Sequence, residues 1–194
     1  MKKLLLMLMV LPLLSLGQSK ITRAFYEIPF SSTREDITNS ILKRGGEIDK
    51  QRSTDQKLVV SNLNFRNREA LSVVFLFEKD TLYQASATLK NDSISVLDLF
   101  LHTKNDIDTV YGRGEFKKEF ILPYKEGDGV ELIAIRRGFA NYSCTWQSVL
   151  SNKHKALISL RINKNNVELT YEDSTVIEKF LAERRNTLKH NLPK

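Results

Sequence analysis

The sequence predicts an α+β fold of two helix-then-antiparallel-strand units, the second one longer, followed by a C-terminal helix. Three observations support this fold class. Capping signatures precede three amphipathic stretches and mark the starts of three helices. Runs of alternating apolar and polar residues follow the first two of these stretches. Short polar turns join the runs into hairpins, so we expect neighbouring strands to be antiparallel.

Residues 1–17 have the pattern of a signal peptide. Lys2 and Lys3 precede an apolar run over residues 4–14, and small residues follow where signal peptidase cleaves. The run is shorter than the roughly 20 residues that span a bilayer as a helix. We therefore expect a mature chain of residues 18–194 that is exported, periplasmic or secreted, and has no transmembrane segment after cleavage. A retained N-terminal anchor is the alternative.

Positive charge exceeds negative charge, with 30 Lys and Arg against 23 Asp and Glu and a net charge of +7. A positive protein associates with anionic surfaces. For an exported protein these are membrane headgroups, envelope polysaccharide phosphates or acidic proteins, before nucleic acid. Solubility alone is the alternative explanation of the charge.

The first unit begins with a lead-in strand over residues 21–30. Ser32 and Glu35 form a capping box, which predicts a helix over residues 33–44. Gly45 follows the last apolar position and supplies a left-handed residue that ends the helix.

Three strands complete the first unit. Residues 57–65 form one strand, and residues 70–89 form a hairpin with its turn at residues 78–80. The first strand of the hairpin is apolar on both faces, which is typical of a strand in the middle of a sheet. In the second strand, the alternation places Tyr83 on the same face as Ala85.

The second unit begins with a longer helix over residues 95–110. Ser95 is its predicted N-cap, with Asp98 at the capping-box position, and Gly112 ends it. Residues 116–124 are predicted to be an edge strand, because their lysines discourage pairing with another sheet.

Two more hairpins follow. The first is predicted from residues 130–137 and 139–147 around Gly138, and the second from residues 156–163 and 166–171. We expect all these elements to form a single α+β domain over residues 18–194, with sub-units at 18–90 and 91–194 that repeat one order of elements.

The C-terminal helix is predicted over residues 175–189. Thr175 and Glu178 form its capping box, and cationic residues in its last turns suit the helix dipole. Its inward face consists of Val176, Phe180 and Leu181.

The sequence contains no G-x-S-x-G nucleophile elbow and no phosphate-binding loop. The histidines lie far apart, and none has another His or Cys at the spacing of zinc ligands, so we predict no metal site and no cofactor. Cys144 is the only cysteine, which rules out an intramolecular disulfide. We expect its thiol to be a buried apolar group, and a Cys144–His pair is the one nucleophile–base couple that the chain offers.

A recognition surface is the remaining candidate site. Arg136, Arg137, Tyr142 and Trp146 are close in sequence and belong to the residue types that most often anchor protein interfaces. The alternative places both aromatic side chains in the core under a helix. A second, weaker candidate is the basic set of Lys153, His154, Lys155, Arg184 and Arg185.

The order of elements resembles that of β-lactamase inhibitory protein and of the small SmpA-type outer-membrane assembly factors. The helix that ends at Tyr111-Gly112 before a strand is similar to the way those units close their helix. The resemblance implies protein–protein binding over a concave sheet face, and it transfers no functional residue to this chain.

These observations predict a non-catalytic, exported module that binds another envelope or extracellular protein through its exposed sheet face. Two alternatives stay open. One is a carrier with an apolar cleft for a lipid-like ligand, and the other is a hydrolase that uses carboxylate chemistry. The oligomeric state is left open by the sequence.

Overall fold

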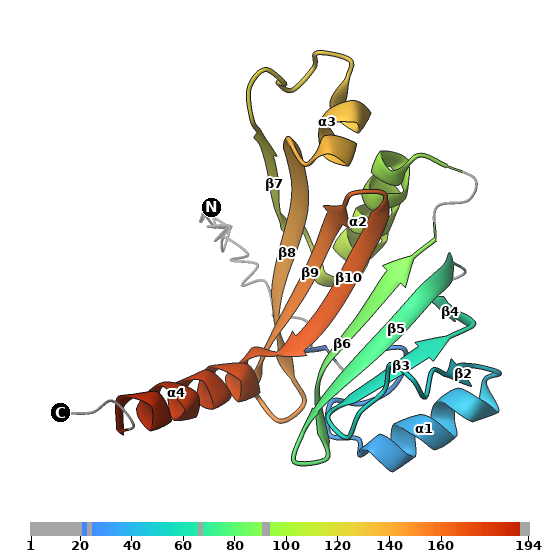
Figure 1. Ribbon diagram of the computed structural model, residues 1–194, viewed down its shortest axis with the longest axis vertical. Helices are drawn as coiled ribbons and strands as arrows, with labels where there is room; N and C mark the ends of the chain where they lie inside the picture. The colour runs from blue at the N-terminus through green and yellow to red at the C-terminus, as the bar shows by residue number, and fades with distance from the viewer. Residues whose placement is uncertain (1–20, 23–24, 66–67, 91–93, 191–194) are drawn as a thin grey trace, which may run out of the picture.

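The computed structural model describes residues 21–22, 25–65, 68–90 and 94–190. These residues form four helices and ten strands (Figure 1). The helices are α1 (Arg34–Lys43), α2 (Val96–Tyr111), α3 (Glu131–Arg137) and α4 (Ser174–His190). The strands are β1 (Ile21–Thr22), β2 (Glu47–Ile48), β3 (Lys57–Ser61), β4 (Leu63–Phe65), β5 (Arg68–Glu78), β6 (Thr81–Leu89), β7 (Glu115–Phe120), β8 (Ala140–Leu150), β9 (Lys155–Asn163) and β10 (Asn166–Asp173).

The strands described here belong to one sheet. Its order is β1-β8-β9-β10-β6-β5-β3-β2, with β4 paired to β5 and β7 paired to β8. The β1–β8 pair is parallel and all the other pairs are antiparallel. Strand β6 pairs with β10, which joins the first half of the chain to the second. The α+β fold with a C-terminal helix that the sequence predicts is thereby confirmed.

The core lies on one face of the sheet. Helix α1 covers it with Ile37 and Ile41, and α2 covers it with Leu99, Phe100 and Ile107, all of them buried. We call the opposite side the open face, because neither α1 nor α2 packs on it. Its middle mixes half-buried apolar side chains, such as Val74, Leu76 and Leu157, with half-buried hydroxyl side chains, namely Ser72, Ser86, Thr88, Ser143, Thr145, Ser159 and Thr170.

The predicted element ends are correct where local signals are strong. Ser95 caps α2 by accepting a hydrogen bond from the backbone of Asp98 (3.1 Å), and Gly112 ends the helix with φ of 83°. The β5–β6 turn has φ of 49° at Lys79 and 62° at Asp80, which is the conformation of a two-residue hairpin turn.

Three local predictions are wrong in detail. Thr33 caps α1 in a capping box with Asp36, so the true pair lies one residue beyond the predicted Ser32 and Glu35. The strand predicted over residues 57–65 is broken at Asn62, which adopts φ of 58° and separates β3 from β4. The lead-in strand predicted over residues 21–30 is too long, because among the described residues of that segment only β1 is a strand.

The segment predicted as a strand over residues 130–137 is helix α3. Its Ala134 and Ile135 are buried side by side, and Gly138 closes the helix at φ of 76°. Helix α3 lacks a side-chain N-cap, so the usual start signal is absent from the sequence. The hairpin predicted over residues 130–147 is therefore a helix followed by β8.

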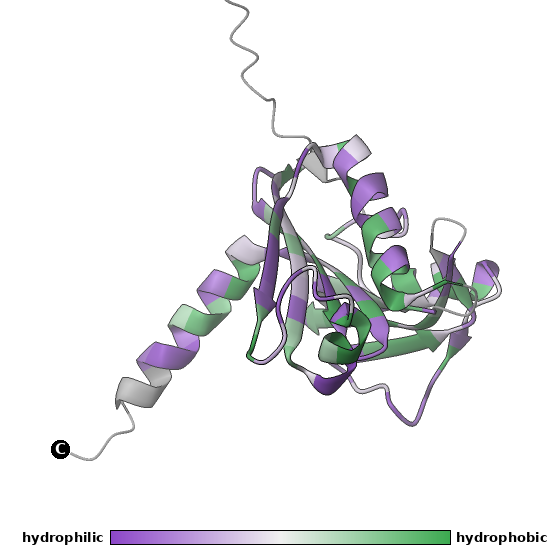
Figure 2. Ribbon diagram, turned by 90° about the horizontal axis from the view of Figure 1, so that it is seen from above, coloured by the Kyte–Doolittle hydropathy of each residue, from purple (hydrophilic) through white to green (hydrophobic). Residues whose placement is uncertain are grey.

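The described C-terminal helix begins one residue earlier than predicted. Asp173 accepts a hydrogen bond from the backbone of Val176 (3.1 Å) and thus replaces Thr175 as the cap. Beyond its first turn the helix projects from the body of the protein (Figures 1 and 2). None of the helices among the described residues is both long and apolar enough to cross a membrane.

Candidate functional site

The four residues predicted to form a recognition surface do not lie together on the surface. Tyr142 is 4% exposed and Trp146 is 3% exposed, and both belong to the core. The ring of Tyr142 contacts those of Phe100, Phe116 and Phe120. Neither aromatic side chain is available to a partner, because strand β8 directs both of them under the helices.

Trp146 belongs to a polar network that fixes the end of α2. Its indole Nε1 donates to Asp108 Oδ1 (2.9 Å) and to the Gly112 carbonyl (3.1 Å). Asp108 also accepts from the Gly114 backbone (3.0 Å) and forms an ion pair with Lys104. Burial raises the pKa of Asp108, but the hydrogen bonds from Lys104, Gly114 and Trp146 outweigh it and hold that pKa below its usual value. The Trp146 indole and the Asp108 carboxylate thus have their hydrogen-bond partners within the protein, and we assign this network a structural role.

Arg136 and Arg137 end α3, within a projecting arm that consists of residues 115–140 (Figure 1). Arg137 Nη1 donates to the hydroxyl of Tyr124 (3.0 Å), so its guanidinium holds the loop before α3. Arg136 is exposed. Of the four predicted residues, Arg136 is thus the one whose side chain is free to meet a partner.

The arm carries a group of exposed large hydrophobic residues that the sequence reasoning missed. Leu122 is 83% exposed and Ile121 is 59% exposed. We call this group the apolar tip, and its members are Ile121, Leu122, Val130, Ile133 and Phe139. The available signal was the pair Ile121-Leu122 itself, since two adjacent apolar residues at the end of an edge strand cannot both face a core.

The loop at the apolar tip is held by its own polar groups. Asp128 accepts from the backbone of Lys125 (2.9 Å) and of Val130 (3.0 Å), and these two bonds lower its pKa. The backbone of Gly127 donates to Glu131 Oε1 (3.0 Å). The loop therefore has one defined conformation before any partner binds.

Contacts with the neighbouring strands add to this bracing. Lys118 on β7 forms an ion pair with Glu126 of the loop. The Ile121 backbone donates to the Phe139 carbonyl (2.8 Å), and the Tyr124 ring stacks on that of Phe139 at 5.5 Å between centroids. The base of the apolar tip is thus fixed to both strands of the arm.

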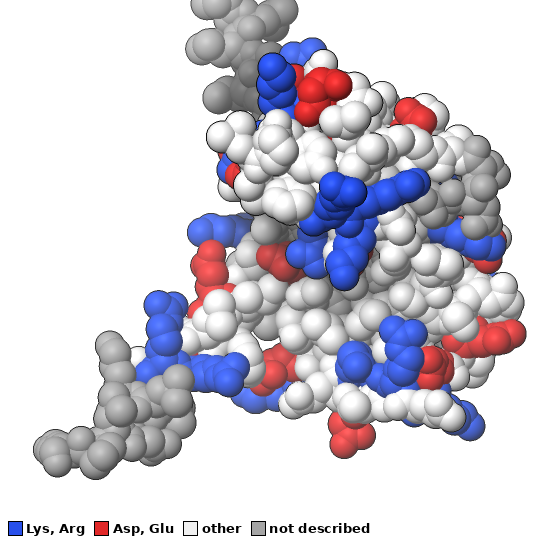
Figure 3. Space-filling view, turned by 45° about the horizontal axis from the view of Figure 1, so that its top comes forward, with Lys and Arg blue, Asp and Glu red and all other residues white. Residues whose placement is uncertain are grey.

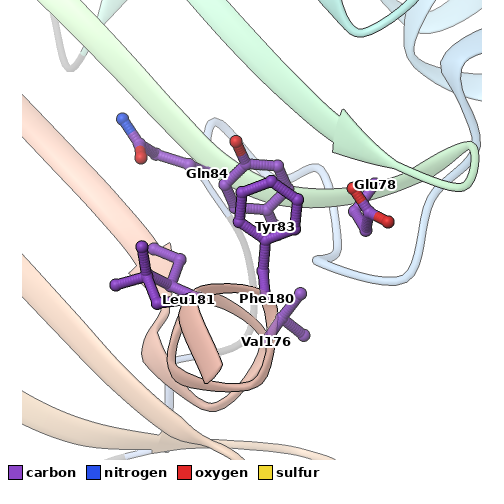
Figure 4. A pocket seen from close by; sticks show the side chains of 7 residues that line it. Glu78, Tyr83, Gln84, Val176, Phe180 and Leu181 are labelled. Carbon is purple, nitrogen blue, oxygen red and sulfur yellow. The ribbon is translucent and has the colours of Figure 1, made fainter. Parts of the chain in front are cut away.

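A second surface feature is a groove of about 210 Å³ between α4 and the open face. Phe180, Leu181 and Val176 point from α4 toward Tyr83 and Gln84 on β6 (Figure 4). Its lining residues are Glu78, Tyr83, Gln84, Val176, Ile177, Phe180 and Leu181. The predicted inward face of α4 therefore meets the sheet only in part, since Phe180 is 44% exposed and Leu181 is 47% exposed.

Tyr83 reaches the groove because of a β-bulge. Leu76 pairs with Gln84 while Phe77 pairs with Leu82, so Tyr83 is the extra residue and Leu82 takes the core position. The predicted placement of Tyr83 with Ala85 is wrong for this reason. Burial, followed by the charges of Glu78 and Glu172, raises the pKa of Tyr83.

The acidic side of the groove is poorly solvated. Glu172 pairs with Gln84 across the sheet, and burial raises the pKa of its carboxyl group. Neither Glu78 nor Glu172 forms an ion pair with any residue in the described ranges. Both carboxylates would gain from a nearby cation.

Groups capable of chemistry do not converge within the described residues. Cys144 is buried, and burial raises the pKa of its thiol to about 11. His154 Nδ1 lies 2.7 Å from Asp173 Oδ2, but no described side chain forms a hydrogen bond with the other nitrogen of this imidazole. The same residues offer no group of three or more His, Cys, Asp or Glu side chains able to hold a metal ion.

The basic residues of the second predicted candidate are divided. Lys153 and Lys155 are exposed near the start of α4, while Arg184 and Arg185 are exposed further along the helix. Figure 3 shows Lys and Arg side chains in several separate groups with Asp and Glu between them. On this face positive charge is therefore not gathered into one patch.

Comparisons of the chain with models of known protein families, with curated proteins and with solved structures found no match.

Proposed function

We propose that the protein is an exported, non-catalytic module that binds another envelope or extracellular protein through the apolar tip of its arm. The observation that carries the proposal is the exposure of Leu122 and Ile121 on a loop whose conformation is already fixed. Exposed apolar groups of this kind mark interaction sites on soluble proteins. The proposed site is the arm and not the open face, since Val74, Leu76 and Leu157 of that face are half-buried whereas Ile121 and Leu122 are exposed.

The exposed area of the two leading side chains is large enough to matter for affinity. Full burial of a Leu or Ile side chain contributes about 1.5–3 kcal/mol. Scaled by the exposed fractions, Ile121 and Leu122 together supply about 3 kcal/mol, or more than a hundredfold in affinity. Because the loop is braced, little of this is lost to ordering it on binding.

The charges around the apolar tip are mixed, with Lys125, Arg136 and Arg137 exposed near Glu126. Lys117 and Lys118 are paired with Glu115 and Glu126. Arg136 is exposed and can form a polar contact at the rim of an interface. A partner with an apolar cleft and an acidic or carbonyl group at its edge fits this arrangement.

The test compares the cross-linking yields of Leu122→Ser and Leu71→Ser, which both replace an exposed leucine, in the native envelope fraction. A photo-activated cross-linker placed at Ile121 should yield one discrete protein adduct. Adding Leu122→Ser to the same protein should reduce that adduct at least about tenfold, since it removes a central apolar contact. The matched control is Leu71→Ser, because Leu71 is also exposed but lies on β5.

Equal adduct yields from Leu122→Ser and Leu71→Ser would contradict the proposal. Circular dichroism and thermal unfolding of both variants are expected to match the original protein, because exposed side chains contribute little to stability. Trp146→Ala is unsuitable as a binding test, since Trp146 is in the core.

The two alternative functions have weaker support. The groove of about 210 Å³ is below the 300–1,000 Å³ that is usual for sites of drug-sized ligands, so this groove is small for a lipid-like molecule. The buried thiol of Cys144, with its raised pKa, disfavours a hydrolase that uses a cysteine nucleophile.

A further inference from the structure

Most of the surface of helix α4 is not covered by the rest of the described protein. It is 17 residues long, and residues 178–186 are all exposed. A helix of this length is only marginally stable in water without packing. Phe180 and Leu181 leave nearly half of their surface uncovered. The projecting part of α4 is therefore expected to gain stability from a partner.

The side chains of α4 change character along one stripe. Ile177 and Leu181 recur at helical spacing on the side that faces the groove, and Arg184 follows them on the same stripe. Arg185 lies beside it and donates Nε to the Leu181 carbonyl (3.3 Å). Neither arginine forms an ion pair with a residue that the structure describes. The stripe thus runs from an apolar start to a cationic end.

The groove at the start of α4 has the opposite charge. Glu78 lines the groove, and Glu172 lies beside it as the cross-strand partner of Gln84. Neither carboxylate forms an ion pair with another residue of the described ranges. Within one molecule α4 extends away from the sheet (Figure 1), and Arg184 and Arg185 lie in its later turns. A second α4, running in the opposite direction, would bring its cationic end to this groove.

We propose that two copies of this chain form a two-fold symmetric dimer in which their α4 helices pack antiparallel, with Arg184 and Arg185 of each copy reaching Glu78 and Glu172 of the other. An axis that passes between Phe180 and Leu181 places position 184 of one helix opposite position 177 of the other. The exposed halves of Phe180 and Leu181 then cover each other at the centre. A two-fold interface of this kind uses the same patch on both subunits.

The expected affinity follows from the size of the contact. A 17-residue helix is about 25 Å long. Two such helices side by side, each also touching the groove of the other copy, bury roughly 1,000 Å² in total, which is at the low end for specific interfaces. We therefore expect a dimer with Kd of about 1–50 µM at low salt, weakening as salt screens the four charge contacts.

The first measurement is sedimentation velocity of the mature protein from about 1 to 200 µM, a range that brackets the expected Kd. A concentration-dependent shift from monomer to dimer is expected. Phe180→Ser with Leu181→Ser should raise Kd at least about tenfold, because both side chains lie at the centre of the contact. A protein that stays monomeric up to the highest concentration would overturn the proposal.

A charge-exchange experiment tests the partners directly. The variant Arg184→Glu/Arg185→Glu and the variant Glu78→Lys/Glu172→Lys should each be largely monomeric, since each places like charges together. An equimolar mixture of the two should dimerise again, because every cross-contact then joins opposite charges. Arg136→Glu is the matched control on the arm and should dimerise as the original protein does.

Two further results would refute the antiparallel arrangement. One is a mixture that stays monomeric while the original protein dimerises. The other is recruitment of the original protein to vesicles of phosphatidylglycerol and phosphatidylcholine without any dimer in solution, which would assign α4 to an anionic membrane. The arm plays no part in this contact, so a negative cross-linking result at Ile121 leaves the dimer prediction standing, and the reverse also holds.

Discussion

The end of α2 offers the sharpest test of how this fold is held together, through the substitution Asp108→Ala. The carboxylate of Asp108 accepts hydrogen bonds from three sources, the Lys104 ammonium, the Gly114 backbone and the Trp146 indole. It therefore connects α2 to the start of β7 and to the centre of β8. Its loss affects all three attachments at once.

The size of the loss in stability depends on which of the three donors can find another acceptor. The Trp146 indole keeps the Gly112 carbonyl at 3.1 Å, and the ammonium of Lys104 can turn to water, but the Gly114 N–H loses its acceptor. A lost hydrogen bond to a charged group costs about 1.5–3 kcal/mol, and an orphaned buried donor costs a similar amount. Alanine recovers about 0.5 kcal/mol through its higher helix propensity. The expected loss in the free energy of unfolding is about 3 kcal/mol.

The assay uses the single tryptophan as its probe. Urea unfolding followed by the fluorescence of Trp146, with circular dichroism as a second signal, gives the free energy of unfolding for each variant. The matched control is Asp106→Ala on the same helix, which removes an ion pair with Arg68 that is partly exposed. This control should cost less than about 1 kcal/mol. If Asp108→Ala cost no more than Asp106→Ala, the argument that this network secures α2 would be refuted.

Three further predictions concern the same region. The pKa of Asp108 is lower in the folded protein than in the unfolded chain. Its contribution to stability is therefore complete above the unfolded pKa of about 4 and is lost as the pH falls through the folded value. Urea midpoints at pH 7 and pH 3 should accordingly differ less for Asp108→Asn than for the original protein. Gly114→Ala should lower the free energy of unfolding by about 1–3 kcal/mol, because a Cβ there would lie 2.5 Å from Trp146 and 2.6 Å from Cys144. Adding Cys144→Ala should restore part of this loss, as measured by thermal unfolding. The thiol of Cys144 should react with Ellman's reagent at pH 8 at least about 100-fold more slowly than an exposed thiol, because it is buried and its pKa is about 11. Rapid labelling of the folded protein would show that this part of the core opens readily.

The features that the sequence predicts correctly are encoded by residues that are close together in the chain. The hairpin turn at Lys79 and Asp80 and the N-cap at Ser95 are encoded within a few residues, since turn chemistry and capping act between near neighbours. For the same reason the edge position of β7 could be inferred from its lysines. Helix α3 differs from the predicted strand because it is short and uncapped, and its continuous apolar run over residues 132–135 is equally compatible with a strand.

The candidate sites depend on contacts that the sequence does not encode locally. Trp146 is in the core because β8 places it on the covered face, where Asp108, 38 residues earlier, accepts its indole N–H; by composition alone it resembles an interface anchor. Tyr83 faces the groove because one bulge shifts the register of β6.

The chain itself determined the fold class, because alternation and capping depend on neighbours in sequence. The tertiary structure decided which side of the sheet is covered and which apolar residues remain outside. Leu122 is as hydrophobic as any core leucine, and it is 83% exposed because none of the described elements packs on it at the end of the arm. Burial is a property of the packed molecule, which is why the apolar tip and the stripe of α4 emerge only in three dimensions.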